Sequence, residues 1–432
     1  MYDIVIIGSG PAGHTAALEA AKHKMKTAVI ERVPEKLGGV CLNEGCIPLK
    51  GLLHYSMHET DYNNIRGIVM QRVGFIRSGL KTRLELAGVE IINGEARFVS
   101  PNEIEVHGRM IKAANFILAV GSSSKKIFNN PAVFAPEKIF DLEEAPKKAL
   151  IIGGGVIGCE YASFLNNIGV SVDIVELMDS ILFGGDTEAV RTVGREFKKK
   201  KIRLYEKSEV LGISTDREVQ IKSGDTVIKD KYDLIIEAIG RRPNTGRIGL
   251  DLAGVKLNEK GFIEVNGQMQ TSAPHIYAAG DCIGGPMLAY TASREASAAI
   301  AHIRNEKPIS LDYSAMPTLV FSHPQLGQVG LTEDKAKETG LEHRVYKYFF
   351  KAIGKAVVEG KDAGFIKLIS DVKENTIVGA TGVGDEMAEI INELTVIINA
   401  KVKIDAVKDC MHIHPSYSEI IVEALNWGLQ PA

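Results

Sequence analysis

The sequence has few cysteines and no long apolar run. Only five of its 432 residues are cysteine, too few for the disulfide framework of a secreted protein. No stretch of about 18 apolar residues occurs, so we expect no transmembrane helix. The N-terminus, MYDIVIIGSG, lacks the basic region of a signal peptide. These absences predict a cytoplasmic protein in a reducing compartment.

An excess of charge of either sign is also lacking. The net charge is −3 and no long basic run occurs, so we expect neither nucleic acid nor a membrane as a partner. Apolar residues make up 45% and charged residues 24%, which is typical of globular proteins. A length of 432 residues exceeds what one hydrophobic core usually organises, and it predicts about two to four domains.

What the chain does contain is a repeated unit, at 2–32 and again at 148–177. Each copy begins with an apolar run typical of a buried parallel strand and continues with G-x-G-x-x-G and a helical pattern. Each then has a second β-branched run that ends in an acid, 23 residues after the first glycine. The residues are Gly8, Gly10, Gly13 and Glu31 in the first copy, and Gly153, Gly155, Gly158 and Glu176 in the second.

This pattern is typical of dinucleotide-binding units. The first glycine permits a tight turn, the second lets the backbone approach a pyrophosphate, and the third lets the helix pack on the strand. The helix N-terminus offers free N–H groups to the phosphates, and the acid accepts hydrogen bonds from a ribose. Two glycine-rich turns of an unrelated α/β protein are the plainer alternative. The equal spacing of both copies favours two bound dinucleotides.

A third glycine–acid element follows at 274–285, PHIYAAGDCIGG. Its apolar run delivers Gly280 and Asp281 to the carboxyl end of a strand, where open α/β sheets bind ligands. We expect this element to return to one nucleotide unit and to hold the ribityl chain or second phosphate of a flavin. A turn or capping aspartate is the alternative reading of Asp281.

Two of the five cysteines lie close together, in GGVCLNEGCIPLK at 38–50. Cys41 and Cys46 can form a disulfide if the chain turns, and Gly45 helps it turn. Pro48 predicts a helix that begins near Cys46, a position that lowers a cysteine pKa and favours a thiolate. We therefore expect Cys46 to face the flavin and Cys41 to exchange with a substrate.

Two alternatives for this pair are a structural disulfide and half of a zinc site. A zinc site needs a second pair of ligands. The other cysteines, Cys159, Cys282 and Cys410, are scattered along the chain. We therefore expect no metal.

With these motifs the chain resembles the pyridine nucleotide–disulfide oxidoreductases, and among them the dihydrolipoamide dehydrogenases. The resemblance runs almost from end to end. Besides the segments above, it rests on NFILAVGS (115–122), LIIEAIGRRPNT (234–245), PMLAYTA (286–292), VFSHPQLGQVG (320–330) and MHIHPSYSE (411–419).

The resemblance implies FAD in the first unit and the nicotinamide cofactor in the second. It places further FAD contacts at Gly39, Val40, Cys41, Ala96, Asp281 and Met287, Leu288, Ala289 and Tyr290. It places Val210 and Gly240 near the nicotinamide dinucleotide. No arginine follows Glu176, and an acid would repel a 2′-phosphate, so we expect NAD rather than NADP.

Thiol exchange also needs a base, and the C-terminal HIHPSYSE contains one. A hydrogen bond from a ring N–H of His414 to the carboxylate of Glu419 would fix the tautomer and raise the basicity of the other ring nitrogen. The resemblance implies that this pair acts on the cysteines of the other subunit of a homodimer. A surface loop and a metal-binding His-x-His are the alternatives, and the role of His412 stays open.

Lys50 and Glu160 form a second candidate pair. Lys50 lies one helical turn after Cys46 on the same side, where its ammonium would stabilise negative charge on a flavin. A buried lysine needs a carboxylate partner, which by resemblance is Glu160. Two solvated helix residues are the alternative.

The predicted fold is α/β, with two Rossmann-like dinucleotide-binding domains for FAD and NAD and a C-terminal α+β dimerisation domain. The strand-like runs after about residue 313 precede a helical pattern at 385–400. The predicted limits are 1–143 and 248–312 for the FAD-binding domain, 144–247 for the NAD-binding domain and 313–432 for the dimerisation domain.

The predicted activity is that of an FAD- and NAD-dependent dithiol–disulfide oxidoreductase. The resemblance favours oxidation of dihydrolipoamide, free or on the lipoyl domain of a 2-oxo acid dehydrogenase or glycine cleavage complex. Leu49 stands where the family usually has serine, and the segment 58–90 is short. A related reductase of another low-molecular-weight disulfide, or a non-catalytic flavoprotein subunit of a larger complex, is therefore the alternative.

Overall fold

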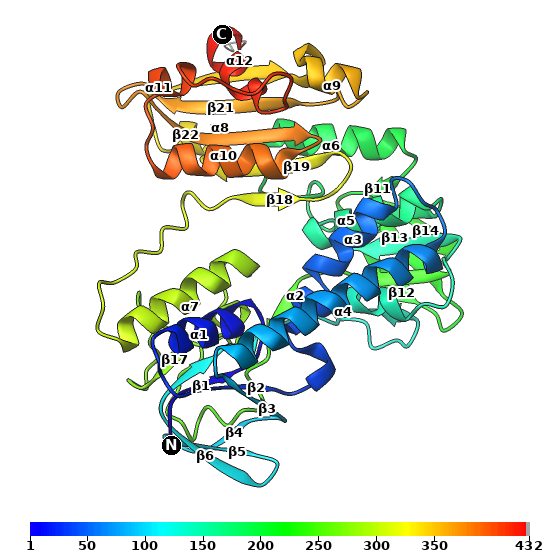
Figure 1. The fold of residues 1–432 in the computed structure, drawn as a ribbon. Helices are drawn as coiled ribbons and strands as arrows, with labels where there is room; N and C mark the ends of the chain where they lie inside the picture. Colours follow the sequence, from blue (N-terminus) through cyan, green and yellow to red (C-terminus); the bar gives the residue numbers. More distant parts are fainter. Residues whose placement is uncertain (429–432) are drawn as a thin grey trace.

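Two sheets with parallel cores and one antiparallel sheet organise the chain, with helices packed on each (Figure 1). The computed structural model describes residues 1–428. The first sheet and the helices α1 and α7 lie at the bottom of the view, the second sheet lies to the right, and the antiparallel sheet lies at the top. The predicted fold class is confirmed.

The first sheet contains the N-terminal glycine turn. Its parallel strands run in the order β3-β2-β1-β6-β17, and an antiparallel β5-β4 extension continues from β6. Strand β17 pairs with β6 although the paired residues, such as Ile276 and Phe116, are 160 positions apart in the sequence. The return of the 274–285 element to the first nucleotide unit is therefore confirmed. The strands are β1 Tyr2–Ile7, β2 Thr27–Glu31, β3 Glu90–Asn93, β4 Arg97–Ser100, β5 Glu103–Val106, β6 Arg109–Leu118 and β17 Ile276–Ala278.

Helices pack on this sheet, and one long helix extends from it toward the second sheet. Helix α1 packs against α7, and α4 runs from this unit toward the second sheet (Figure 1). Alanines of α1 and α7 are buried against each other and the sheet, which lets the two helices approach closely. The helices are α1 Pro11–Lys22, α2 Gly39–Asn43, α3 Cys46–Tyr55, α4 Tyr62–Leu86 and α7 Ala289–Ile303, with 3₁₀ turns η1 Pro34–Lys36 and η3 Asp281–Ile283.

The second sheet is parallel, with the order β11-β10-β9-β15-β8. Helix α5 lies on one face, and an antiparallel meander of β12, β13 and β14 shares a core with the other. A two-stranded ribbon, β7 with β16, links this unit to the first. The elements are β7 Ser122–Ser124, β8 Val133–Phe134, η2 Pro136–Asp141, β9 Lys148–Ile152, α5 Val156–Asn167, β10 Ser171–Val175, α6 Thr187–Lys199, β11 Arg203–Tyr205, β12 Ser208–Ile213, β13 Glu218–Ser223, β14 Thr226–Lys231, β15 Leu234–Glu237 and β16 Arg241–Pro243.

The C-terminal domain is an antiparallel sheet, β18-β19-β22-β21-β20, with helices on both faces (Figure 1). The helical pattern predicted at 385–400 is helix α10, which packs on β19 and β22. The elements are β18 Thr318–Val320, β19 Gln325–Gly330, α8 Glu333–Glu338, β20 His343–Phe349, η4 Phe350–Ala352, α9 Gly354–Val358, β21 Phe365–Asp371, β22 Thr376–Gly384, α10 Met387–Asn399, α11 Ile404–Lys408 and α12 Glu419–Trp427.

The domain limits given above stay predictions. Over residues 1–428, no helix is long and apolar enough to cross a membrane.

Candidate active site

The two glycine turns have the same backbone geometry. Gly8 and Gly153 both have φ of 103°, in the region that favours glycine. A Cβ on Gly13 would lie 1.9 Å from the carbonyl oxygen of Gly8, and one on Gly158 would lie 1.9 Å from that of Gly153. Only glycine permits this contact between the helix and the turn, so the third glycine of each motif has the packing role predicted for it.

The second glycine of each motif faces open space. A Cβ on Gly10 or on Gly155 would meet no atom within 4 Å. Each of these glycines is the N-cap of a 12-residue helix, α1 or α5, and no side chain caps either helix. The first N–H groups of both helices are therefore available to a ligand. This is the arrangement that a pyrophosphate needs, so both turns fit a dinucleotide.

The two acids also have matching positions. Glu31 ends β2, and its carboxylate accepts hydrogen bonds from Ser9, the residue between the first two glycines. Glu176 follows β10, and its Oε2 accepts one from the N–H of Gly154, 2.6 Å away. Each carboxylate therefore lies at the rim of its own glycine turn, where a bound ribose would meet it.

Two segments distant in sequence approach the first glycine turn. Gly39 begins α2 and lies so close that its Cβ would be 2.8 Å from Cα of Gly10. Asp281 begins η3, accepts a hydrogen bond from Ser122 Oγ, and lies 3.6 Å from Nε of Arg241. The predicted flavin contacts Gly39, Val40 and Cys41 thus belong to a short helix. Gly280, which precedes Asp281, lies near the start of α1, because a Cβ on it would be 3.5 Å from Cβ of Ala12.

The remaining predicted FAD contacts lie at or just before the start of η3, α7 and β4. Gly280 precedes η3, with φ of 80°. Met287 and Leu288 precede α7, which begins at Ala289, and Tyr290 is 46% exposed. Ala96 is buried just before β4.

Of the predicted NAD contacts, Val210 is half-buried on β12 and packs against the same apolar cluster as Ile239. Gly240 follows β15 and is exposed, with φ of 106°. The glycine turn at Gly153 lies against Ala238, two residues earlier.

Cys46 lies at the start of a helix, as predicted. Cys46 is the first residue of α3, and Cys41 is on α2. Both are free thiols within hydrogen-bonding reach of each other. A hydrogen bond from Cys41, helped by the charge of Lys50, lowers the pKa of Cys46 to about 7. The same hydrogen bond, together with burial, raises the pKa of Cys41. Cys46 is therefore the sulfur that is a thiolate near neutral pH.

Lys50 and Glu160 are in contact. Their Nζ and Oε2 atoms lie 2.7 Å apart, with the glutamate side chain 1% and the lysine side chain 30% exposed. The other oxygen of Glu160 accepts a hydrogen bond of 3.0 Å from the N–H of Phe321, whose ring lies 4.8 Å from the ammonium. A buried carboxylate thus holds a lysine one turn after Cys46, and the pair is not two solvated residues.

The predicted hydrogen bond between His414 and Glu419 is present. Nδ1 of His414 lies 2.8 Å from Oε1 of Glu419, which begins α12 and whose other oxygen accepts from the N–H of Ser416. Burial raises the pKa of Glu419, but the hydrogen bonds from Ser416 and His414 outweigh it, so the pKa is lowered. The carboxylate therefore stays charged and fixes Nδ1 as the donor, which leaves Nε2 to accept a proton.

The structure does not bring this histidine to the cysteines of its own chain. Helix α12 packs chiefly on β20, β21 and α11, in the domain farthest from the first sheet (Figure 1). The His414 side chain is 79% exposed. His412, whose role was left open, has its own partner, because its Nε2 lies 2.9 Å from Glu393.

Sequence reasoning missed the residues that support these groups. Phe321, Ser122 and Arg241 hold Glu160 and Asp281 from positions distant in the sequence, and no local pattern marks them. Ser9 could have been found, since it lies within the first glycine motif. No group of three or more metal-ligating side chains occurs within residues 1–428.

The chain matches two family models. Residues 2–296 match the pyridine nucleotide-disulphide oxidoreductase model, and residues 316–425 match the dimerisation domain of the same family. Members of this family bind FAD and a pyridine nucleotide, and the second match supports a homodimer.

Relatives of similar length match the chain almost throughout. The dihydrolipoyl dehydrogenase of Chlamydia pneumoniae is 36% identical over 98% of this chain and 96% of its own. That of Bacillus subtilis is 35% identical over 98% and 97%.

Among solved structures, the HOCl-induced flavoprotein disulfide reductase RclA of Escherichia coli superposes with a TM-score of 0.93, at 29% identity, over 99% of this chain and 100% of its own. LpdA of Mycobacterium tuberculosis, at 23% identity and a TM-score of 0.90, shares the fold over 98% of both chains.

Proposed function

This chain belongs to the pyridine nucleotide-disulphide oxidoreductase family, and on that premise we propose that it is an NAD-dependent dihydrolipoamide dehydrogenase. The reaction oxidises dihydrolipoamide to lipoamide and reduces NAD⁺. The relatives at 36% and 35% identity carry that activity in their names. The coarser activity, that of a flavoprotein disulfide oxidoreductase, is the activity of the family.

The observation that carries the proposal is the asymmetric cysteine pair. Cys46 begins α3 with its pKa lowered to about 7, while the pKa of Cys41 is raised. In the oxidised pair, a substrate thiolate attacks Sγ of Cys41 and releases Cys46 as the better leaving group. The second substrate thiol then displaces Cys41, so the substrate disulfide forms and the cysteines are left as thiol and thiolate.

His414 removes the proton that this exchange releases. A substrate thiol must lose its proton before it attacks, and Nε2 of His414 is free to accept it. Because the His414 side chain is 79% exposed and is hydrogen-bonded to the first residue of α12, in the domain farthest from the first sheet, we propose that it serves the cysteines of the second subunit. Glu419 stabilises the charged imidazole that results.

The glycine turns and the Lys50–Glu160 pair serve the cofactors. FAD at the first turn, when bound, supplies the two-electron link between the cysteines and NAD⁺ at the second turn. Lys50 places a positive charge next to the thiolate-bearing end of α3, and Glu160 keeps that charge in position. Glu176 at the rim of the second turn favours NAD over NADP, because it repels a 2′-phosphate.

Two further points belong to the same proposal. The partner is a dithiol, free or on the lipoyl domain of a 2-oxo acid dehydrogenase or glycine cleavage complex. The proposed location is the cytoplasm, since five cysteines in 432 residues are too few for the disulfide framework of a secreted protein.

A second candidate is a reductase that uses NADH to reduce another small disulfide. RclA is matched over its full length at a TM-score of 0.93, and Leu49 replaces the serine that the family usually has after the second cysteine and Pro48. Leu49 is buried on α3, one residue before Lys50. The same cysteine pair performs this reaction in reverse.

One comparison on a single purified sample separates these candidates. We expect NADH-dependent reduction of lipoamide to exceed that of glutathione disulfide by at least about tenfold in kcat/KM, with NAD⁺-dependent oxidation of dihydrolipoamide also present. Preference for another disulfide would favour the second candidate. If Cys41→Ser turned over as fast as the wild type, the pair would be structural and the chain a cofactor-binding subunit.

A further inference from the structure

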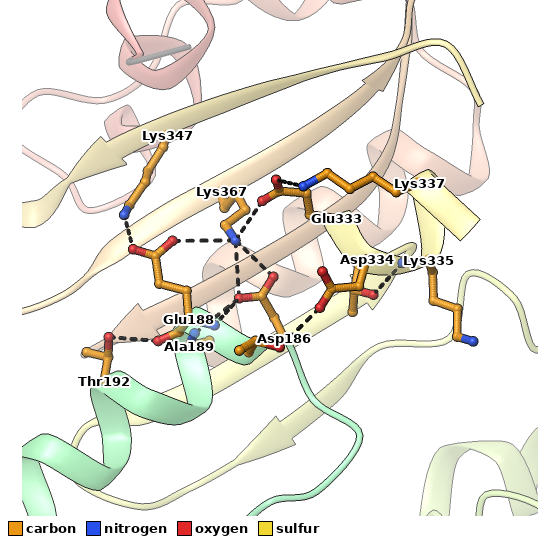
Figure 2. A network of polar contacts seen from close by, with 12 residues as sticks. Asp186, Glu188, Ala189, Thr192, Glu333, Asp334, Lys335, Lys337, Lys347 and Lys367 are labelled. Atoms are coloured by element: carbon orange, nitrogen blue, oxygen red, sulfur yellow. Dashed lines mark hydrogen bonds and ion pairs between the residues drawn. The ribbon is translucent and has the colours of Figure 1, made fainter. Parts of the chain in front are cut away.

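Lys367 is a buried lysine where the second unit meets the C-terminal domain. It lies on β21, its side chain is 5% exposed, and its ammonium contacts three carboxylates (Figure 2). Nζ lies 3.0 and 3.2 Å from the two oxygens of Asp186, 3.1 Å from Glu333 and 3.5 Å from Glu188. Burial lowers the pKa of Lys367, but the carboxylates outweigh it and raise the pKa, so the lysine stays charged.

The two shortest of these ion pairs differ in what they connect. Glu333 is on α8, so its pair with Lys367 lies within the C-terminal domain. Asp186 is the N-cap of α6 in the second unit, is 2% exposed, and its Oδ1 accepts the N–H groups of Glu188 and Ala189 at 3.1 Å each. The Lys367–Asp186 pair therefore fixes the first turn of α6 to the sheet of another domain (Figure 2).

The segment before Asp186 leads directly back to the second glycine turn. It connects Glu176, the acid proposed to bind the ribose, with Asp186. Within it, the N–H of Leu182 donates a 2.8 Å hydrogen bond to the carbonyl of Gly154, and the N–H of Gly154 donates to Glu176. The anchored residue Asp186 is thus four residues from a direct backbone contact with the G-x-G turn.

This segment is not in a relaxed conformation. Leu182 has φ of 50°, which a residue with a side chain adopts at a cost, and Gly184 follows with φ of 89°. A Cβ on Gly154 would lie 2.8 Å from Cγ2 of Ile181, so the segment lies closely against the turn. Strained backbone persists only where both of its ends are held. Glu176 holds one end, and Asp186 holds the other.

We propose that Lys367 is a positioning residue for the nicotinamide dinucleotide: by binding Asp186 it keeps the segment 177–185 against the Gly153–Gly155 turn. The inference rests on the proposed function in one respect, the binding of NAD at that turn. The inference goes beyond the proposed function, because it makes the affinity for the dinucleotide depend on an ion pair with the C-terminal domain. Without the Lys367–Asp186 pair, the segment spends part of its time away from Gly154. The affinity for the dinucleotide is then multiplied by the fraction of time that the segment is in place.

The test compares three variants by NADH binding, measured directly by titration of NADH fluorescence. Lys367→Met removes the ion pair with Asp186, while Lys347 on β20 still pairs with Glu188 of α6. Lys367→Met/Asp186→Asn removes the same ion pair without leaving an unpaired charge at Asp186, and keeps an N-cap oxygen on α6. Glu333→Gln is the matched control, since it removes a carboxylate that contacts Lys367 at a similar distance but leaves the Asp186 pair in place.

We expect both variants that lack the lysine to bind NADH about tenfold more weakly, as for a segment in place a tenth of the time. The KM for NADH should rise in these variants, while kcat should stay within about twofold of the wild-type value. The alkylation rate of Cys46 should not change. Glu333→Gln should bind NADH within about twofold of the wild type, even if its Tm falls.

Two results would overturn the inference. One is a folded double variant that binds NADH as the wild type does. The other is a loss of NADH affinity in Glu333→Gln as large as that in Lys367→Met, which would make the network a stability element only. A wild-type protein that binds no NADH would instead overturn the proposed function, and is distinguished from both.

Discussion

The carboxylate of Glu160, on the second glycine helix, lies 2.7 Å from the ammonium of Lys50, on the helix that begins with Cys46. Glu160 is 1% exposed and its other oxygen binds the backbone of Phe321, just beyond β18. One carboxylate therefore connects α3, the second nucleotide unit and the start of the C-terminal domain. The position of the lysine beside Cys46 depends on all three.

This geometry predicts an asymmetry between two substitutions. Lys50→Met leaves the buried Glu160 with one hydrogen bond and no counter-charge, whereas Glu160→Gln leaves Lys50 free to turn to solvent. Lys50→Met should lower the free energy of unfolding by about 2 kcal/mol, and Glu160→Gln by about half of that. Chemical denaturation of both variants checks this order, with the exposed pair Lys335–Glu338 as the control site, where Lys335→Met should have no measurable effect. Equal losses in the two variants would contradict it.

The pKa of Cys46 predicts the pH dependence of its alkylation in the reduced protein. The thiolate is the reactive form, so the rate should rise with pH through a midpoint near 7, about two units below that of an ordinary thiol. The hydrogen bond from Cys41 is the largest cause, so Cys41→Ala should shift the midpoint upward. Iodoacetamide labelling at each pH, with the site identified by peptide mass spectrometry, measures both. A midpoint above about 8.5 in the wild type would show that Cys46 is not the activated sulfur.

Glu176 predicts the choice between NADH and NADPH. Its carboxylate lies at the rim of the second glycine turn, bound to the N–H of Gly154, where it would contact a ribose and repel a 2′-phosphate. The loss of both effects together should change specificity by about 10²-fold. The wild type should prefer NADH strongly, and Glu176→Arg should narrow or invert the ratio of kcat/KM values. Asp179→Asn, three residues further on, is the control and should keep the preference. Equal use of both cofactors by the wild type would remove the argument.

Much of the fold and of the site follows from local sequence. The glycine turns and the helix start at Cys46 depend on residues close in sequence, so spacing predicts them. The His414–Glu419 hydrogen bond is also local, and the family resemblance indicated that pair. The return of β17 to the first sheet was also predictable, because a flavin needs a second phosphate site there.

Long-range polar contacts are not marked by any pattern in the local sequence. Phe321 reaches Glu160 across 161 residues through its backbone N–H, which any residue type could supply. Asp186 reads in the sequence as an ordinary helix N-cap, and Lys367 as one lysine in a strand, although they meet across 181 residues. A residue's type and its neighbours state what it can bind, but only the packing of whole domains decides which distant residue it meets.

The last prediction tests the shared active site. His414 is exposed and hydrogen-bonded to Glu419, the first residue of α12 in the C-terminal domain, while the cysteines lie on α2 and α3. If His414 serves the cysteines of the other subunit, His414→Gln should lose about 10²–10⁴-fold in dithiol turnover, the usual contribution of a general base. Its binding of NADH should not change, because the second glycine turn is intact.

Now let His414→Gln subunits exchange with Cys41→Ser subunits, each inactive alone. In a heterodimer, one site combines an intact cysteine pair with an intact histidine, and the other site has both defects. Half of the dimers in a random mixture are heterodimers, so activity should return to about a quarter of the wild-type value per chain. Native mass spectrometry confirms the exchange. Heterodimers that form and stay inactive would mean that His414 acts within its own chain or is not the base.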